Sequence, residues 1–459
     1  MFILIFIGLA ASLAVGFALK FMLDRSGSRY QIDNTELAIG SALVALLICP
    51  LTAWVGTKLA ISSQVTYNEN WGGYELKANW VRTTCERDGS CVHHYDCDPY
   101  TVEVECGGYE GSGKDRHYVS KKCPETRYHD CPYTTEEWTF TIDTTIDPVT
   151  VASHNLPTNP DLHRWRSYKS VPSSIESGIP QFWSECKARL DRNEPGPVTM
   201  RKEYENYVLA SQTTILKRYS DSIERYKTAG LLPPINRNVH DFYFANRVYF
   251  VGARPPGDWQ TAINRFDAAL GSQLQGDLHL VLVDANKVTD PDNYSLALFA
   301  YWQSKEFDKD ALSKNGIVVV LGSEDGQTVK WARAGTGMPE GNEALLTDIQ
   351  NQLPGTRLDP QVILGNPTAA LVNGGVQVTH TDGVLEKVLW GANAFKRVHM
   401  GKPGQPGNVG YSYLLQEIEP TGLQCFLIVL CQVLMSGIVW GVCIAYGAPR
   451  MRGFRFRSW

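Results

Sequence analysis

Residues 277–284 read DLHLVLVD, and residues 316–322 read GIVVVLG. Each stretch is an almost unbroken run of apolar residues of strand length, which is typical of a strand buried on both faces. An amphipathic helical pattern covers residues 259–274, and a second one lies between the two strands. This alternation predicts an α/β domain over residues 241–400 in which helices cover both faces of a sheet.

Acidic residues follow both of these strands. Asp284 ends the first strand, while Glu324 and Asp325 come directly after the second. Ligands of open α/β sheets bind at the carboxyl ends of strands, and oxygen ligands of this kind suit Ca²⁺ or Mg²⁺. The alternative is that Glu324-Asp325-Gly326 is a turn between strands and that Asp284 caps a helix or faces solvent. The three carboxylates are therefore a candidate metal site, and no cofactor is assured.

The run SKNGIVVVLGSEDGQTVKWARAGTGM, residues 313–338, resembles the TPM-domain family, and the likeness extends over about residues 258–350. It rests on Lys314-Asn315-Gly316, on the acidic pair, and on Gly335-Thr336-Gly337, where Thr336 replaces the aromatic residue usual in the family. The resemblance implies a TPM-like α/β sandwich tethered to a membrane outside the cytoplasm. It also implies either phosphatase activity or a role in assembling membrane complexes. We expect the loop with Gly335 and Gly337 to lie near the carboxylates.

Three apolar runs, at residues 1–23, 37–57 and 421–448, are long enough to cross a hydrocarbon core of about 30 Å. They predict three transmembrane helices. A cleavable signal peptide is the alternative for the first run, but the usual positive residues before it are missing, and a second apolar run follows closely.

Basic residues predict the orientation of these spans. Lys20, Arg25 and Arg29 lie in or beside the first loop, and four arginines lie in the tail at 449–459. Loops and tails rich in lysine and arginine stay in the cytoplasm. The C-terminal tail is therefore expected inside, and the main domain, between residues 60 and 420, outside the cytoplasm. The bilayer is an expected partner, and the chain has no basic surface pattern typical of nucleic-acid binding.

Cysteines gather in the first part of the ectodomain. An even number of cysteines outside the cytoplasm favours disulfides, and Cys97 with Cys131 is the favoured bridge because their flanking sequences, YDCDPY and YHDCPY, are alike. Zinc held by cysteine and by His93, His94, His117 or His129 is the alternative, as are free thiols. The six predicted disulfide cysteines are Cys85, Cys91, Cys97, Cys106, Cys123 and Cys131.

The remaining segments complete the domain plan. Residues 62–145 are expected to form a Cys-rich β module, whose sequence resembles uncharacterised membrane proteins of bacteria and their phages. Residues 146–240 are expected to form a connector followed by one long helix over 198–229. The expected function is a membrane-anchored envelope protein that binds an envelope or membrane protein or helps a complex to assemble. A metal-assisted phosphatase acting outside the cytoplasm is the alternative.

Overall fold

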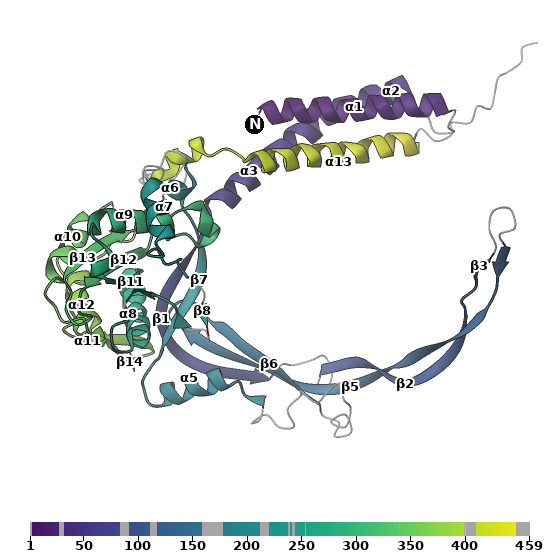
Figure 1. The fold of residues 1–459 in the computed structure, drawn as a ribbon. Coiled ribbons are helices and arrows are strands. Elements are labelled where there is room, and N and C mark those ends of the chain that lie inside the picture. The colour runs from purple at the N-terminus through teal and green to yellow at the C-terminus, as the bar shows by residue number, and fades with distance from the viewer. Residues whose placement is uncertain are drawn as a thin grey trace, which may run out of the picture.

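The computed structural model contains a mixed α/β domain, a second sheet that extends into a long two-stranded ribbon, and three apolar helices (Figure 1). The structure describes residues 2–26, 32–82, 91–110, 117–157, 178–211, 220–236, 239–240, 244–252, 254–338, 340–398, 400 and 410–446. The predicted basic tail and Cys85 lie outside the described residues.

The α/β domain is built on a four-stranded sheet of order β10-β11-β12-β13. The strands are β10 (Val248–Val251), β11 (Asp277–Asp284), β12 (Gly316–Ser323) and β13 (Trp331–Thr336). The first three strands run parallel, and β13 returns antiparallel to β12 after a tight turn. DLHLVLVD and GIVVVLG are therefore the two central strands, β11 and β12, and every residue of β12 is buried.

Helices cover both faces of this sheet (Figure 1). The alternation along β11 divides its side chains between two cores: Leu278, Leu280 and Leu282 face one side, and Val281 and Val283 face the other. The first face is covered by α8 (Trp259–Leu274), α10 (Glu343–Gln352), α11 (Pro360–Leu364) and α12 (Val384–Leu389), and the second by α7 (Ser220–Thr228) and α9 (Pro291–Trp302). The expected mixed α/β class is confirmed.

The second sheet has the order β2-β5-β1-β7, with β6 also paired to β5. Its strands are β1 (Thr66–Arg82), β2 (Cys91–Glu105), β5 (Lys122–Thr144), β6 (Val149–Pro157) and β7 (Pro197–Glu205). Helix α5 (Gln181–Asp191) packs Trp183 and Cys186 against this sheet beside Phe140. Short pairs of strands complete the described β-structure: β3 (Gly108–Glu110) with β4 (His117–Val119), β8 (Val239–His240) with β9 (Phe244–Ala245), and β14 (Thr368–Val372) with β15 (Gly375–Thr379).

The single long helix predicted over 198–229 is wrong. Its first part is strand β7, which pairs antiparallel with β1 from Thr66 opposite Glu205 to Tyr74 opposite Pro197. After it come the short helix α6 (Tyr207–Ala210) and, later, helix α7. Pairing with a strand more than a hundred residues earlier in the chain overrides the local helical spacing. The β sheet therefore extends beyond the predicted boundary at residue 145, into the segment expected to be a connector.

The segment QVILGN, which reads as a strand in the sequence, also folds differently. Residues 360–364 form helix α11, and the side chain of Asp359 accepts hydrogen bonds from the backbone N–H groups of Gln361 and Val362. A capping aspartate followed by proline in the first helical turn is a helix start. The capping aspartate and the proline therefore favour a helix here, although the apolar run is typical of a strand.

Three helices among the described residues are long and apolar enough to cross a membrane: Phe2–Ser26, Asn34–Val65 and Gly422–Ala445. The first is α1 (Phe2–Ser26) and the third belongs to α13 (Gly422–Tyr446). The second is continuous through α2 (Asn34–Leu43), a π-helical segment η1 (Val44–Ile48) and α3 (Cys49–Val65), with Pro50 in the first turn of α3. The three predicted spans are confirmed as apolar helices. The first two are longer than expected, and the third is a few residues shorter.

Small residues let α1 and α13 approach closely. The buried residues of α1 are Leu4, Gly8, Ser12 and Gly16, which recur every fourth position. A Cβ atom at Gly8 would lie 1.7 Å from Gln432 Oε1, and one at Gly16 would lie 2.5 Å from Trp440. Close packing of small residues is a main source of helix association in membranes.

Hydrogen bonds hold together the two ends of the segment that lies between the second and third apolar helices. Gln64, in the last turn of α3, donates from Nε2 to Gln424 Oε1 (2.8 Å) and to the Glu419 carbonyl (2.9 Å). Gln424 donates in turn to Ser63 Oγ (3.1 Å). The end of α3 and the start of α13 therefore lie side by side.

The β sheet and the α/β domain are joined by direct backbone contact. A Cβ atom at Gly72 in β1 would lie 2.0 Å from the carbonyl oxygen of Asp267 in α8, and one at Gly271 would lie 2.5 Å from the backbone N and O of Gly72. Because the backbones of β1 and α8 approach so closely, no side chain fits between them at Gly72 and Gly271. Strand and helix therefore form one rigid connection.

Candidate functional site

The predicted carboxylates lie at one edge of the α/β sheet, as expected from the strand ends. Asp284 ends β11 and is paired in register with Ser323, the last residue of β12. Its Oδ1 accepts hydrogen bonds from Asn286, from the backbone N at 3.0 Å and from Nδ2 at 3.1 Å. Asp284 therefore acts as the N-cap of the 3₁₀ turn η6 (Ala285–Lys287).

Asp325 and Glu324 are also engaged in their own turn. Asp325 Oδ1 accepts hydrogen bonds from the backbone N of Gln327 and of Thr328, both at 2.8 Å, and from Ser323 Oγ at 3.0 Å. These donors, the backbone N–H of Gln327 first, lower the pKa of Asp325 to about 2. Glu324 forms an ion pair with Lys330.

The surroundings of this edge leave little room for a ligand. The cavity beside Asp284 and Ser323 measures about 10 Å³, which is close to the space that one water occupies. Within the described part of the chain, no group of three His, Cys, Asp or Glu residues is placed to hold a metal ion. The geometry of Asp284, Glu324 and Asp325 is that of a structured turn.

Gly335 and Gly337 do not lie near these carboxylates. Because β13 runs antiparallel to β12, Gly335 is paired with Val318, and the Gly337 N–H donates to the Gly316 carbonyl at 3.0 Å. The glycines therefore sit at the beginning of β12, whereas Asp325 follows its end, roughly seven residues or 23 Å away along the strand. The prediction of a loop near the site is wrong, and the hairpin between β12 and β13 is the reason.

A larger cavity lies where the second and third apolar helices meet the rest of the chain, and we call it the juxtamembrane cavity. Its volume is about 520 Å³, within the range of small-molecule sites. Its walls come from the end of α3 and start of β1, from α6, from the segment around η7 (Lys305–Asp310), and from the start of α13. The lining residues are Ser63, Gln64, Thr66, Tyr67, Leu209, Ala210, Gln303, Ser304, Lys305, Asp308, Lys309, Ala311, Thr421 and Gln424.

Charged and hydroxyl groups give this cavity its chemistry. Lys305 is exposed and forms no ion pair with any described residue, while Lys309 has Glu203 at 3.8 Å. Burial, with a contribution from the charge of Asp308, raises the pKa of Tyr67 to about 12. The Tyr67 hydroxyl is therefore a neutral hydrogen-bond donor at physiological pH. The cavity offers two ammonium groups, one carboxylate and several neutral donors.

The backbone is strained at the cavity wall. Asp308 interrupts η7 with φ 45° and ψ −122°, values close to the first central position of a type II′ turn, which favours glycine. A non-glycine residue held there costs on the order of 1–3 kcal/mol. Strain of this kind is concentrated at functional sites.

Replacing Asp308 with glycine is expected to stabilise the protein. Glycine adopts this conformation without steric conflict, which removes the strain from the folded state. Glycine also loses more conformational entropy on folding, so the free energy of unfolding is expected to rise by about 1 kcal/mol. Thermal unfolding of the full chain in detergent measures this as a higher midpoint. Asp308→Ala, which keeps the strain, is the matched control, and an equal gain in both variants would show that the carboxylate rather than the backbone is responsible.

The juxtamembrane cavity could not be predicted from the sequence, because its walls come from four segments that are distant in the chain. The available signal was the placement of polar side chains at the ends of two apolar spans, Ser63 and Gln64 after one, and Thr421 and Gln424 before the other. Such polar residues frequently mark the membrane boundary and do not by themselves indicate a cavity.

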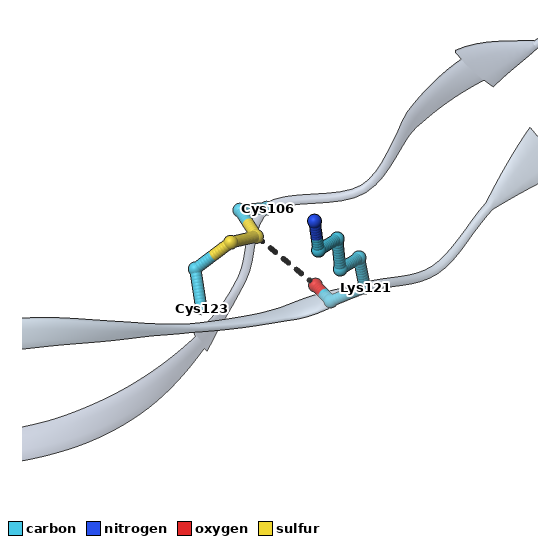
Figure 2. The surroundings of a disulfide bond; sticks show 3 residues. All are labelled: Cys106, Lys121 and Cys123. Carbon is cyan, nitrogen blue, oxygen red and sulfur yellow. Dashed lines mark hydrogen bonds between the residues drawn. A yellow bond between two sulfur atoms is a disulfide. The ribbon is translucent and has the colours of Figure 1, made fainter.

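The second candidate region is the ribbon, which we define as β2 with the facing part of β5, residues 91–105 and 122–135. Its distal end stands clear of the other described elements (Figure 1). Cys106 and Cys123 form a disulfide there (Figure 2). The Cys106 N–H also donates to the Lys121 carbonyl at 2.8 Å, so the two strands are held together at this point. Two of the six predicted disulfide cysteines are thereby paired, in a combination that the sequence did not predict.

The favoured bridge between Cys97 and Cys131 remains a prediction. The register sets Cys97 opposite His129 and Cys131 opposite Tyr95. The side chains of Cys91, Cys97 and Cys131 lie outside the described residues, as do those of His93 and His94.

The ribbon presents a charged and aromatic surface. The ribbon contains six acidic and two basic residues, an excess of four negative charges. Tyr100 is 39% exposed and Tyr128 53%, and Tyr100 lies 4.6 Å from the His129 ring, measured between centroids. Exposed tyrosines on a rigid strand are typical of protein-binding surfaces.

Comparison of the chain with protein-family models, curated proteins and solved structures finds no match, so the argument for function rests on the geometry of the juxtamembrane cavity, the strand-end edge and the ribbon.

Proposed function

We propose that the protein is a membrane-anchored binding or assembly factor whose ribbon holds a partner protein outside the cytoplasm. The anchor is the set of three apolar helices. The orientation, with the ectodomain outside and the basic tail inside, rests on the positions of lysine and arginine in the sequence. A TPM-like α/β sandwich would then serve as the rigid body that carries the ribbon.

The exposed acidic ribbon is the observation that carries this proposal. A two-stranded ribbon is marginally stable alone, and this one is stabilised by a disulfide although it adds nothing to the core of the α/β domain. Its acid excess favours a partner with a basic surface, because complementary charge steers association and fixes the docked orientation. The partner is therefore an envelope or membrane protein that presents lysine and arginine.

The phosphatase alternative receives less support. Asp284 and Asp325 already accept hydrogen bonds from their own turns, and the low pKa of Asp325 makes it a poor general base. The cavity beside Asp284 has room for about one water, and Asp325 is exposed to solvent, so the described residues at this edge do not enclose a phosphate ester. The binding function is therefore the better account of the described residues.

Site-specific photo-cross-linking in native membranes tests the proposal. A photoreactive residue at position 100 or 128 is expected to give a discrete protein adduct, and one at Val372, which is 44% exposed on the α/β domain, is not. The double variant Asp96→Asn, Glu105→Gln removes two ribbon charges and is expected to reduce the adduct yield several-fold. Added salt is expected to have the same effect. The control double variant Glu340→Gln, Glu343→Gln is expected to leave the yield unchanged.

Two results would count against the binding function. One is the absence of a ribbon-specific adduct at both positions. The other is release of phosphate from an aryl phosphate by the purified full chain that is lost in the Asp284→Ala, Asp325→Ala variant, which would establish the enzymatic alternative.

A further inference from the structure

The position of the juxtamembrane cavity limits what can reach it. Helix α13 has 25 residues and is therefore about 37 Å long, which exceeds a hydrocarbon core of about 30 Å but not the full bilayer of about 40–45 Å. Its first turn, with Gln424, and the last turn of α3, with Gln64, therefore lie at the level of the lipid headgroups. The cavity opens where phospholipid headgroups are the most concentrated solutes.

The lining groups match the chemistry of such a headgroup. The Lys305 and Lys309 ammonium groups can bind a phosphate as point charges. Asp308 can accept hydrogen bonds from a headgroup amine or hydroxyl, and the Tyr67 hydroxyl can donate one. Leu209 and Ala210 give an apolar wall on which glycerol carbons can pack.

We propose that the juxtamembrane cavity binds the phosphate-bearing headgroup of a membrane phospholipid, with Lys305 and Lys309 on the phosphate and Asp308 on the headgroup amine or hydroxyl. Ser63, Gln64 and Gln424, which are joined by hydrogen bonds, line the cavity at the ends of the apolar helices. A bound lipid then fills the space between the α/β domain and the bilayer and fixes the height of the domain above the membrane. This site is independent of the ribbon and of its partner.

Binding of short-chain phospholipid to the detergent-solubilised full chain tests this proposal. Dihexanoyl phosphatidylethanolamine, added below its micellar concentration, is expected to bind one molecule per chain in native mass spectrometry. Lys305→Ala with Lys309→Ala is expected to weaken binding at least tenfold. Lys330→Ala with Lys387→Ala, which removes two exposed lysines elsewhere on the α/β domain, is expected to leave it unchanged.

Three comparison arms make the test decisive. Dihexanoyl glycerol, which lacks the phosphate, is expected not to bind, and equal affinity for it would overturn the proposal. Displacement of the lipid by an equal concentration of inorganic phosphate would identify a soluble phosphate compound as the ligand and would also overturn it. Ala210→Phe, which narrows the cavity without removing a charge, is expected to abolish binding, and retained binding in this variant would place the lipid elsewhere.

Discussion

Replacement of Arg247 by methionine is expected to lower the free energy of unfolding by about 3–5 kcal/mol, the cost of removing one partner from a buried ion pair. The Arg247 side chain is fully buried, and its Nε lies 2.8 Å from both Asp267 Oδ2 and Asp277 Oδ1. Its Nη1 also donates to Asn264 Oδ1 at 2.7 Å and to Thr199 Oγ1 at 3.2 Å. The variant leaves two buried carboxylates without their counter-charge.

The loss of stability in the Arg247→Met variant is expected to depend on pH. Burial raises the pKa of Asp267 well above its usual value, and the charge of Arg247 opposes this. Without the arginine the pKa of Asp267 in the folded state rises further above that in the unfolded state. The variant is therefore expected to be most stable at acidic pH, where Asp267 is protonated in both states, and to lose stability as the pH rises through the folded-state pKa.

Chemical denaturation of the full chain in detergent, at several pH values, measures both effects. Arg357→Met, at a side chain that is 70% exposed, is the control and is expected to change stability by less than about 0.5 kcal/mol. Adding Asp267→Asn and Asp277→Asn to Arg247→Met is expected to restore part of the stability and to flatten the pH dependence. A triple variant as unstable as the single one would contradict the electrostatic explanation.

The second large effect is expected at the contact between β1 and α8. Gly72→Val should destabilise the full chain by about 3 kcal/mol or more, because its Cβ would fall 2.0 Å from a backbone oxygen that no rotamer change can move. The same change should expose the joint between sheet and helix to limited proteolysis. Gly108→Val, where a Cβ meets nothing within 4 Å, is the control. Equal behaviour of the two variants would show that sheet and domain are not rigidly joined.

Those parts of the fold that depend on local pattern could be predicted from the sequence. The unbroken apolar runs gave β11 and β12, and the helical spacing of Trp259, Ile263 and Phe266 gave α8. The three spans follow from length and apolar composition alone. These elements bury surfaces that their own sequence already marks as apolar.

The rest depends on contacts between distant segments. Strand β7 exists because β1 lies beside it, and Gly72 is glycine because α8 approaches its backbone. Arg247 reads as an ordinary charged residue until Asp267 and Asp277 are seen around it. The candidate carboxylates at Asp284 and Asp325 were placed correctly at the strand ends, but their turn geometry could not be separated from a metal site by residue type alone.

The direct junction between helix α3 and strand β1 has a mechanical consequence. Helix α3 ends at Val65 and strand β1 begins at Thr66, so no linker separates this apolar helix from the sheet. Strand β5 then pairs with both β1 and β2. A force that pulls on the ribbon along its length acts in shear on many of these backbone hydrogen bonds at once. The force then passes from β1 directly into α3.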